Sequence, residues 1–256
     1  MFTWRTFKFN PLAPPPGTDF LYWAQIVADL FFDAFFPTPA AASKNAFLNA
    51  LIHLYGRFQE RYGPAVYPCM SDLQEEMKTA EPDSGPDRSQ ACLNRLRPLL
   101  LLLHDMFDCQ AGFSLEDLLN EPVVLELDGL TQEIQAFILT VLFYWIFTYR
   151  LGQTQRGTLK HILVFDEAKM VFSKEKASGA APVARLVSTA REMGQGQVAA
   201  DQMPSTLGHA LLANVSVLIA LSLSARKDMQ DMAYAMGLHD AQREYLNHLP
   251  LGLGIV

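Results

Sequence analysis

The segment at residues 161–169, which reads His-Ile-Leu-Val-Phe-Asp-Glu-Ala-Lys, constrains the fold of this chain more than any other. Its apolar residues run without a break into two adjacent carboxylates, Asp166 and Glu167. A short apolar run of this kind is typical of a strand buried on both faces of a parallel sheet. Ligands of such sheets bind at the carboxyl ends of the strands. We therefore expect Asp166 and Glu167 to lie at a ligand-binding edge.

Two adjacent acids at the end of a buried strand suit the hydrolysis of a nucleoside triphosphate. The first carboxylate can hold a hydrated Mg²⁺ ion, and the second can orient or polarise the attacking water. A strand followed by Asp-Glu also occurs in α/β proteins with other activities, so the motif is weak when taken alone. The neighbouring segments therefore decide how Asp166 and Glu167 are interpreted.

A second apolar segment ends in polar residues further along the chain. Val198, Ala199 and Ala200 are followed by Asp201 and Gln202. The proline two residues after Gln202 prevents the strand from continuing. A Gln at the end of the strand beside the acidic one can contact the terminal phosphate of a nucleotide and respond to its loss. The simpler interpretation is that Gln202 caps a loop.

Together these segments resemble the HerA/VirB4/FtsK-type ATPases, which are DNA-pumping motors of the RecA-like P-loop class. That family combines an apolar strand ending in Asp-Glu-Ala with a later Arg-x-x-Gly region and a strand ending in Gln before a Pro-Ser turn. The corresponding segments here are 166–168, 191–194 and 202–205. The resemblance implies an α/β fold: a RecA-like P-loop NTPase core with a mostly parallel sheet, plus an inserted helical subdomain.

Further similarities cover nearly the whole chain. Residues 7–16, where Asn-Pro-Leu precedes three prolines, look like the strand and proline turn that follow the first helix in VirB4-like members. Residues 123–129 look like the strand before the acidic one, and residues 236–256 look like the closing helix and last strand. The order of these motifs is more specific than any single motif.

The family's phosphate-binding loop, G-x-x-x-x-G-K-[ST], does not occur in this sequence. Its backbone amides cradle the phosphates, and its Lys reaches the outer ones. The nearest pattern, at residues 152–158, has Thr158 in place of the Lys, and we interpret it as a flexible loop. Because the family places the P-loop before the Asn-Pro-Leu region, we expect it upstream of Met1 in a longer protein. The chain alone is then expected to be inactive.

The resemblance also implies residue roles. Asp166 would hold Mg²⁺ through water, Glu167 would be the catalytic carboxylate, and Gln202 would contact the terminal phosphate. Arg191 is the candidate for an arginine that acts at the site of a neighbouring subunit. The simpler interpretation of Arg191 is a solvated residue favoured by the helix dipole.

The implied function is that of a fragment of an ATP-driven nucleic-acid translocase, which couples hydrolysis to movement of DNA or of a secretion or conjugation substrate. Its cofactors would be ATP and Mg²⁺. Its partners would be further copies of itself in a ring, a hexamer, together with DNA. A nuclease would accompany a HerA-like role, and a secretion machine would accompany a VirB4-like role; the sequence does not choose between them.

Two other functions remain open. Asp128, Glu167 and Lys169 imitate the D…E-x-K arrangement of metal-dependent nucleases, which requires Glu167 and Lys169 on one face of a continuing strand. A non-catalytic structural or interaction module, such as a degenerate ATPase, is the second alternative. The absent P-loop favours that module, whereas the intact Asp-Glu pair and Gln202 argue against decay.

Composition places limits on these functions. Half of the 256 residues are hydrophobic and 18% are charged, which suits a sizeable core and argues against disorder. The net charge is −7 and the pI is about 5.3, so the chain as a whole lacks a basic nucleic-acid footprint. Cys69, Cys92 and Cys109 lack zinc-ligand spacing and the histidines are scattered singly, so we expect free thiols and no metal cage.

No secretory signal is recognisable at the start of the chain. The longest apolar run, residues 136–149, is shorter than the roughly 20 residues that span a bilayer, and it suits a helix buried against the sheet. We expect a cytoplasmic protein, with a peripheral position at the inner membrane as the alternative.

Three segments are expected along the chain: a strand and proline turn of the core at 1–18, a helical subdomain at 19–120, and the Walker B and sensor half of a RecA-like core at 121–256. Apolar residues between Phe20 and Phe31 recur at helical spacing. Two further helices are expected at 44–62 and 93–107. In the last segment we expect strands at 123–128, 161–166, 197–201, 217–223 and 252–256, and helices at 132–150, 182–193, 205–213 and 227–247.

Overall fold

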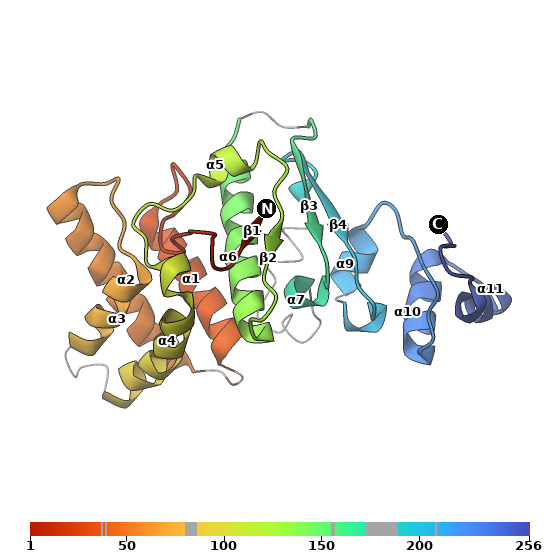
Figure 1. Ribbon diagram of the computed structural model, residues 1–256, viewed down its shortest axis with the longest axis horizontal. Coiled ribbons are helices and arrows are strands. Elements are labelled where there is room, and N and C mark those ends of the chain that lie inside the picture. Colours follow the sequence, from red (N-terminus) through yellow and green to blue (C-terminus); the bar gives the residue numbers. More distant parts are fainter. Residues whose placement is uncertain (37, 39, 80–85, 155–156, 173–188, 208) are drawn as a thin grey trace. The chain divides into compact units, whose positions relative to one another are not determined.

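The computed structural model describes residues 1–256 except 37, 39, 80–85, 155–156, 173–188 and 208. The chain forms two compact units, Met1–Thr154 (unit 1) and Gln155–Val256 (unit 2), whose elements Figure 1 labels. These units are defined by contacts within the structure. The three predicted segments, 1–18, 19–120 and 121–256, are defined by resemblance to an ATPase core, and that division stays a prediction.

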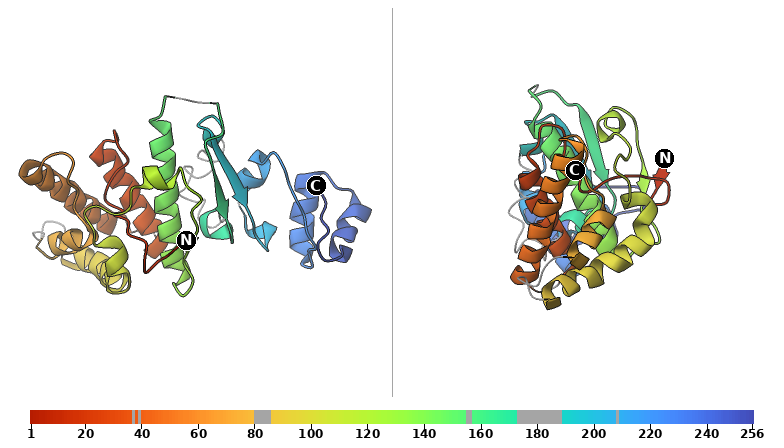
Figure 2. Two further views of the ribbon diagram at one scale, coloured as in Figure 1. Left: turned by 45° about the horizontal axis from the view of Figure 1, so that its top comes forward. Right: turned by 90° about the vertical axis from the view of Figure 1, so that its left-hand side faces the viewer.

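Unit 1 is a bundle of helices with a small parallel sheet. Its helices are α1 (Phe20–Phe35), α2 (Ala41–Tyr62), α3 (Met70–Thr79), α4 (Pro86–Phe107), α5 (Leu115–Leu118) and α6 (Gln132–Leu151). Helix α1 packs against α2 and α6, while α3 and α4 pack against α2 and against each other (Figure 2). Strand β1 (Phe2–Thr3) pairs with β2 (Leu125–Glu126). Because β1 supplies only two residues to this ladder, β2 is shorter than the strand predicted at 123–128.

The predicted apolar stripe of α1 is confirmed as the centre of unit 1. Trp23, Val27 and Phe31 are fully buried at helical spacing. Phe31 stacks on Phe47 of α2 with ring centroids 4.6 Å apart and meets Phe137 of α6 edge-on at 6.0 Å. Each such side chain contributes about 1.5–3 kcal/mol through burial. Aromatic side chains of α1, α2 and α6 therefore hold these three helices together.

Helix α6 is longer than the predicted 132–150 by one residue. Among the described residues it is the one helix whose length and composition would suit a membrane crossing. Of the most apolar 18-residue stretch of α6, 56% is buried inside the structure. Phe137, Ile138 and Phe143 belong to this buried part and contribute to the core. A core helix and a membrane helix both satisfy the test of length and composition.

The Asn-Pro-Leu segment is a buried turn that receives hydrogen bonds from three helices. Trp23 Nε1 of α1 donates to Pro11 O at 3.0 Å, and Trp145 Nε1 of α6 donates to Ala13 O at 3.1 Å. The Tyr55 hydroxyl of α2 donates to Leu12 O at 2.5 Å. The predicted proline turn is thus confirmed. The strand expected just before it, within residues 7–10, is not formed; the strand of this region is β1 at Phe2–Thr3.

Asn10 closes this turn from the other side. It is 3% exposed, its Nδ2 donates to Pro68 O at 2.9 Å, and its Oδ1 accepts from Leu12 N at 2.9 Å. Buried polar groups of this kind are stabilising only while every partner is present. Asn10 therefore joins the turn to the segment before α3.

Unit 2 contains the strands that carry the predicted motifs. Strand β3 (His161–Phe165) pairs in parallel with β4 (Gln195–Ala199), from His161 opposite Gln195 to Phe165 opposite Ala199. Helix α7 (Lys169–Phe172) follows β3; η3 (Pro204–Thr206) and α9 (His209–Asn214) follow β4 in place of the helix predicted at 205–213. Most of the helix predicted at 182–193 lies outside the described residues.

One face of β3 is exposed, although the sequence predicts burial on both faces. Phe165 is buried and its ring meets Phe172 of α7 at 5.3 Å. On the opposite face, Ile162 is 53% exposed, Val164 is 70% exposed, and Val198 of β4 is 50% exposed. Successive side chains of a strand point to opposite faces, so α7 reaches only the Phe165 side.

The end of the chain forms a small core of its own. Ala220, Met232, Leu246 and Leu249 are buried together there. The helix predicted at 227–247 is two helices, α10 (Arg226–Met236) and α11 (Asp240–Tyr245), followed by η4 (Leu246–His248). Gly237 ends α10 in the left-handed conformation, with φ +67°.

The strands predicted at 217–223 and 252–256 are wrong as members of a parallel sheet. These segments meet only at an antiparallel bridge between Ala220 and Ile255. Leu253 N donates to Pro250 O, so the chain turns just before the bridge and does not extend a ladder.

Substitution Asn10→Ala should lower the free energy of unfolding by about 3 kcal/mol, because it leaves Leu12 N and Pro68 O buried without their partners. Urea denaturation measures this change. The matched control is Asn94→Ala on the exposed face of α4, where Asn94 Oδ1 accepts from Gln90. We expect less than about 0.5 kcal/mol there. Equal effects of the two substitutions would show that the turn at Asn10 does not anchor unit 1.

Candidate functional site

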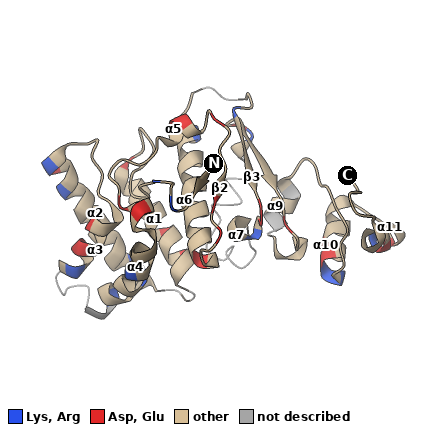
Figure 3. Ribbon diagram, in the orientation of Figure 1, with Lys and Arg blue, Asp and Glu red and all other residues tan. Residues whose placement is uncertain are grey.

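The parallel pairing of β3 and β4 brings the two predicted polar segments to one edge. Beyond the last register pair, Ala200 N donates to Phe165 O at 2.9 Å and Ala168 N donates to Ala200 O at 3.0 Å. The chain after β3 therefore stays hydrogen-bonded to the chain after β4. Acidic residues occupy both of these segments (Figure 3). The site consists of the turn at 166–169 and the loop at 200–205.

The turn at 166–169 holds Glu167 in an unusual conformation. Glu167 has φ +53°, and it is the one non-glycine residue with a positive φ in the described part of the chain. Such a conformation costs about 1–3 kcal/mol and persists only where its surroundings enforce it. Here four consecutive backbone N–H groups are engaged: Glu167 N donates to Asp166 Oδ1, Ala168 N to Ala200 O, Lys169 N to Asp201 Oδ2, and Met170 N to Glu167 O.

The two acidic side chains of this turn are available to a ligand. Asp166 and Glu167 are both exposed, while Ala168 beside them is completely buried. The predicted strand 161–166 ends at Phe165, so both carboxylates follow the strand directly, as expected. A carboxylate at this edge can hold a hydrated cation, and its neighbour can accept a hydrogen bond from water.

Gln202 lies in a loop that two hydrogen bonds to aspartate side chains hold in place. Met203 N donates to Asp201 Oδ1 at 2.9 Å, and Ser205 N donates to Asp228 Oδ1 of α10 at 2.8 Å. Asp228 is only 6% exposed. Gln202 itself is exposed within the turn that the Asp201–Met203 hydrogen bond closes, three residues after the end of β4. Its strand begins and ends two residues earlier than the predicted 197–201.

Arg191 lies at the other end of the sheet. It precedes β4, whereas Asp166, Glu167 and Gln202 follow the carboxyl ends of β3 and β4. A strand of this length spans about 16 Å. The structure therefore does not bring exposed Arg191 to the edge of its own subunit that carries Asp166 and Glu167.

Gly194 has a steric role in the turn after Arg191. Its φ is +74°, and a Cβ atom there would lie 2.1 Å from Thr158 O. Lys160 N donates to Gly194 O at 2.7 Å, and Gly157 N donates to Glu192 O at 3.1 Å. The glycine therefore permits close packing of two backbone segments.

The nuclease-like set is not assembled on one strand. Glu167 and Lys169 would have to continue β3, but β3 ends at Phe165 and Lys169 begins α7. Asp128 belongs to unit 1, where its carbonyl accepts a hydrogen bond from Trp4 Nε1 at 3.0 Å. The strand geometry on which that alternative depends is therefore absent between Glu167 and Lys169.

Two residues without a predicted role, Asp201 and Asp228, hold the loops of the site with their carboxylates. An Asp whose side chain accepts from the backbone two residues on is a common turn former. Asp201, two residues before Met203 and three before Pro204, shows this signal. Asp228 shows none, because its partner Ser205 is distant in sequence.

A polar cluster in unit 1 has no nucleophilic character. Cys69 Sγ lies 2.7 Å from Asp108 Oδ1 and 3.1 Å from Asp72 Oδ2, so the two carboxylates share its single S–H donor. Burial, together with these carboxylates, raises the pKa of Cys69 to about 12, and burial raises the pKa of Cys92 to about 12. Both thiols are therefore protonated at neutral pH. All three cysteines are free, as the sequence predicts.

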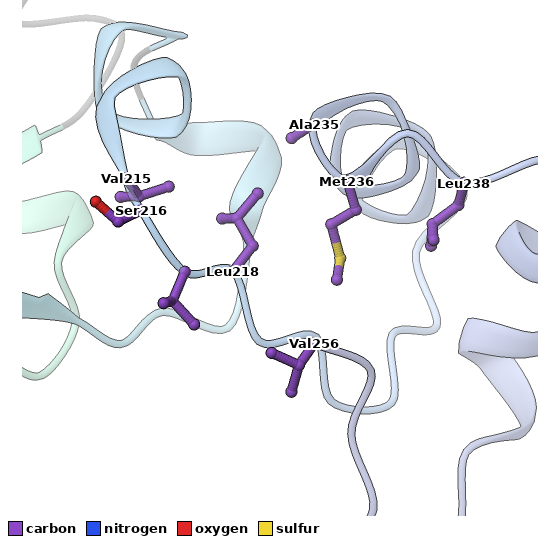
Figure 4. A pocket seen from close by; sticks show the side chains of 8 residues that line it. Val215, Ser216, Leu218, Ala235, Met236, Leu238 and Val256 are labelled. Atoms are coloured by element: carbon purple, nitrogen blue, oxygen red, sulfur yellow. The ribbon is translucent and has the colours of Figure 1, made fainter.

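A hollow near the end of the chain is separate from the acidic edge. Its volume is about 360 Å³, and Figure 4 shows Val215, Leu218, Met236 and Val256 among its lining residues. The one polar side chain in the lining is that of Ser216. The lining thus offers no carboxylate or imidazole for catalysis.

Comparison with known proteins reveals similarity at the level of structure. No protein-family model matches the sequence, and no curated protein sequence matches it. VirB4 of Thermoanaerobacter pseudethanolicus superposes with a TM-score of 0.72 at 15% identity, over 100% of this chain and 73% of that chain. The plasmid coupling protein TrwB, in complex with ADP and Mg²⁺, superposes with a TM-score of 0.59 at 16% identity, over 88% of this chain and 58% of that chain.

A third structure agrees with these two. The conjugative coupling protein TrwBΔN70, in its trigonal form with sulphate, has a TM-score of 0.63 at 16% identity, over 96% of this chain and 67% of that chain. The resemblance to VirB4/FtsK-type P-loop ATPases is confirmed at the level of the fold. In its described residues, this chain has two small parallel sheets together with helices. It spans 58–73% of the lengths of these three structures.

Proposed function

We propose that this chain is the Walker B and sensor half of an ATP-driven motor of the VirB4/TrwB type. The observation that carries the proposal is the pairing of β3 with β4. Because this pairing is parallel and in register, it puts Asp166 and Glu167 beside the loop of Gln202. Structural similarity to VirB4 over the whole chain supports the same conclusion.

The residues fit a nucleotide carrying Mg²⁺. Mg²⁺ prefers carboxylate oxygens, keeps several of its waters, and usually takes the rest of its ligands from phosphates. Asp166 is exposed and would hold the hydrated ion, which neutralises charge on the phosphates when bound. Glu167 would accept a hydrogen bond from the attacking water and orient it. Gln202 would contact the terminal phosphate.

The phosphate-binding loop of the motor is assigned to a part of the parent protein outside this chain. The nearest glycine pattern, 152–158, has Thr158 where a Lys is needed. The exposed apolar face of β3 and β4, with Ile162, Val164 and Val198, supports a further layer of structure beside these strands. A RecA-like core would be complete only with that layer.

The substrate is proposed to be DNA, or a protein moved by a secretion or conjugation machine. The TrwB structures are of plasmid and conjugative coupling proteins, which favours the conjugation side over HerA-like end processing with a nuclease. Unit 1 holds 18 of the 27 acidic and 10 of the 20 basic residues, so unit 2 is the less acidic part. Contact with a nucleic-acid backbone is therefore assigned to unit 2 or to the rest of the parent. The working form would be a hexameric ring in the cytoplasm, peripheral to the inner membrane.

Substitution Glu167→Gln in the full-length gene product should reduce ATP turnover by on the order of 10²-fold or more. The amide keeps the shape of the side chain but loses the charge that orients water, so nucleotide should bind as before. Steady-state ATPase assays and equilibrium binding of an ATP analogue measure the two quantities. The control is Glu244→Gln on the exposed part of α11, which should leave both unchanged. Full turnover by the Glu167 variant would reject Glu167 as the catalytic carboxylate.

Arg191 is proposed to complete the site of the neighbouring subunit, since it lies at the opposite end of β4 from its own acidic edge. Substitution Arg191→Ala should then abolish turnover while leaving folding and nucleotide binding intact, because the guanidinium that neutralises the negative charge on the transferred phosphate is lost. The control is Arg226→Ala at the exposed start of α10. ATPase rate, nucleotide affinity and ring assembly are measured together.

Mixing the Arg191→Ala and Glu167→Gln proteins provides the decisive comparison. In mixed rings, on the order of one interface in four combines an intact Glu167 with an intact Arg191 and should recover activity. Absence of recovery in rings whose assembly is confirmed would place Arg191 on the solvent-facing surface, as a helix-end residue.

A further inference from the structure

Asp201 joins the two halves of the acidic edge. Its Oδ2 accepts from Lys169 N at 2.7 Å, and its Oδ1 accepts from Met203 N at 2.9 Å. The first bond holds the turn that carries Glu167, and the second holds the loop that carries Gln202. One carboxylate thus spans the segments that follow β3 and β4.

The turn on the Glu167 side needs such a support. Glu167 has φ +53°, which a residue with a Cβ adopts only when neighbouring contacts enforce it. The contacts that hold the following residues are Ala168 N with Ala200 O and Lys169 N with Asp201 Oδ2. The first of these contacts joins two backbone groups, and the second depends on the side chain of Asp201.

The geometry favours support over direct participation in catalysis. Both oxygens of Asp201 already accept backbone N–H groups, and the residue is half-buried. Asp166 and Glu167 are exposed, by contrast. A carboxylate whose two oxygens accept backbone N–H groups fixes the positions of neighbouring residues. The exposed side chains of Asp166 and Glu167 are then the ones that can contact a ligand.

We propose that Asp201 is a positioning residue: its carboxylate sets the distance between Glu167 and Gln202 by tying the turn at 166–169 to the loop at 201–203. This inference rests on the proposed ATPase function for its catalytic consequence, but the tie itself is a property of the chain alone. A displacement of about 1 Å in a catalytic group can cost about 10²-fold in rate. Asp201 therefore affects the rate of hydrolysis through the placement of other side chains.

The first experiment measures the tie without nucleotide. In the 256-residue chain, amide hydrogen exchange is followed at Lys169 and Met203 in the wild type, in Asp201→Ala and in Asp201→Asn. Both amides should lose protection together in Asp201→Ala, by roughly 10-fold or more. Asp201→Asn keeps one acceptor oxygen and should retain partial protection at one of them. Unchanged protection in both variants would overturn the proposal.

The second experiment measures the consequence in the full-length gene product. Asp201→Ala should lower kcat by roughly 10- to 100-fold with the nucleotide Kd unchanged, and Asp201→Asn should recover part of this loss. The matched control is Asp19→Ala, since Asp19 also accepts from two backbone N–H groups, Leu21 N and Tyr22 N, but in unit 1. It should lower the melting temperature and leave kcat and the exchange at Lys169 and Met203 unaltered.

The outcomes separate the two claims. A wild-type kcat in Asp201→Ala, or a loss equal to that in Asp19→Ala, would overturn the positioning role. Absence of ATP hydrolysis by the wild-type gene product would overturn the proposed function, and the hydrogen-exchange result would then decide on the tie by itself. Joint loss of protection with a fall in kcat supports both.

Discussion

The in-register parallel pairing of β3 with β4 is the constraint on which the candidate site depends. Parallel strands end at the same edge, so residues far apart in sequence become neighbours without any direct bond between their side chains. The last register pair, Phe165 with Ala199, determines that Asp166 and Glu167 stand beside Asp201 and Gln202. A shift by one residue would turn every side chain of the shifted strand to the opposite face of the sheet and misplace the whole set.

The site combines a stable frame with one strained residue. Glu167 carries the positive φ, while Ala168 beneath it is fully buried and held by Ala200 O. Asp228 of α10 fixes the far end of the Gln202 loop through Ser205 N. The two exposed side chains expected to meet a nucleotide, Glu167 and Gln202, therefore stand on backbone segments that are tied down. This arrangement is what preorganised electrostatic catalysis requires.

The acidic strand could be predicted to within one residue, because an uninterrupted apolar run followed by charge leaves few alternatives. The start of β4 could not, since Gln195 and Gly196 are not apolar although Gln195 is 3% exposed. The mostly apolar segments 217–223 and 252–256 predict strands of a parallel sheet, whereas in the structure they meet at an antiparallel bridge. Hydrogen-bond partners between distant segments, such as Asp201 with Lys169, leave no periodic trace in a sequence.

The most direct test of the central claim is a crystal structure of the full-length gene product with a non-hydrolysable ATP analogue and Mg²⁺. We expect Asp166 in the water shell of the metal, Glu167 beside the water that faces the terminal phosphate, and Gln202 within reach of that phosphate. The side chains of Asp166 and Gln202 should then lie within roughly 12 Å of each other, with one phosphate and its hydrated ion between them. A nucleotide bound away from the ends of β3 and β4, or a larger separation of these two side chains, would contradict it.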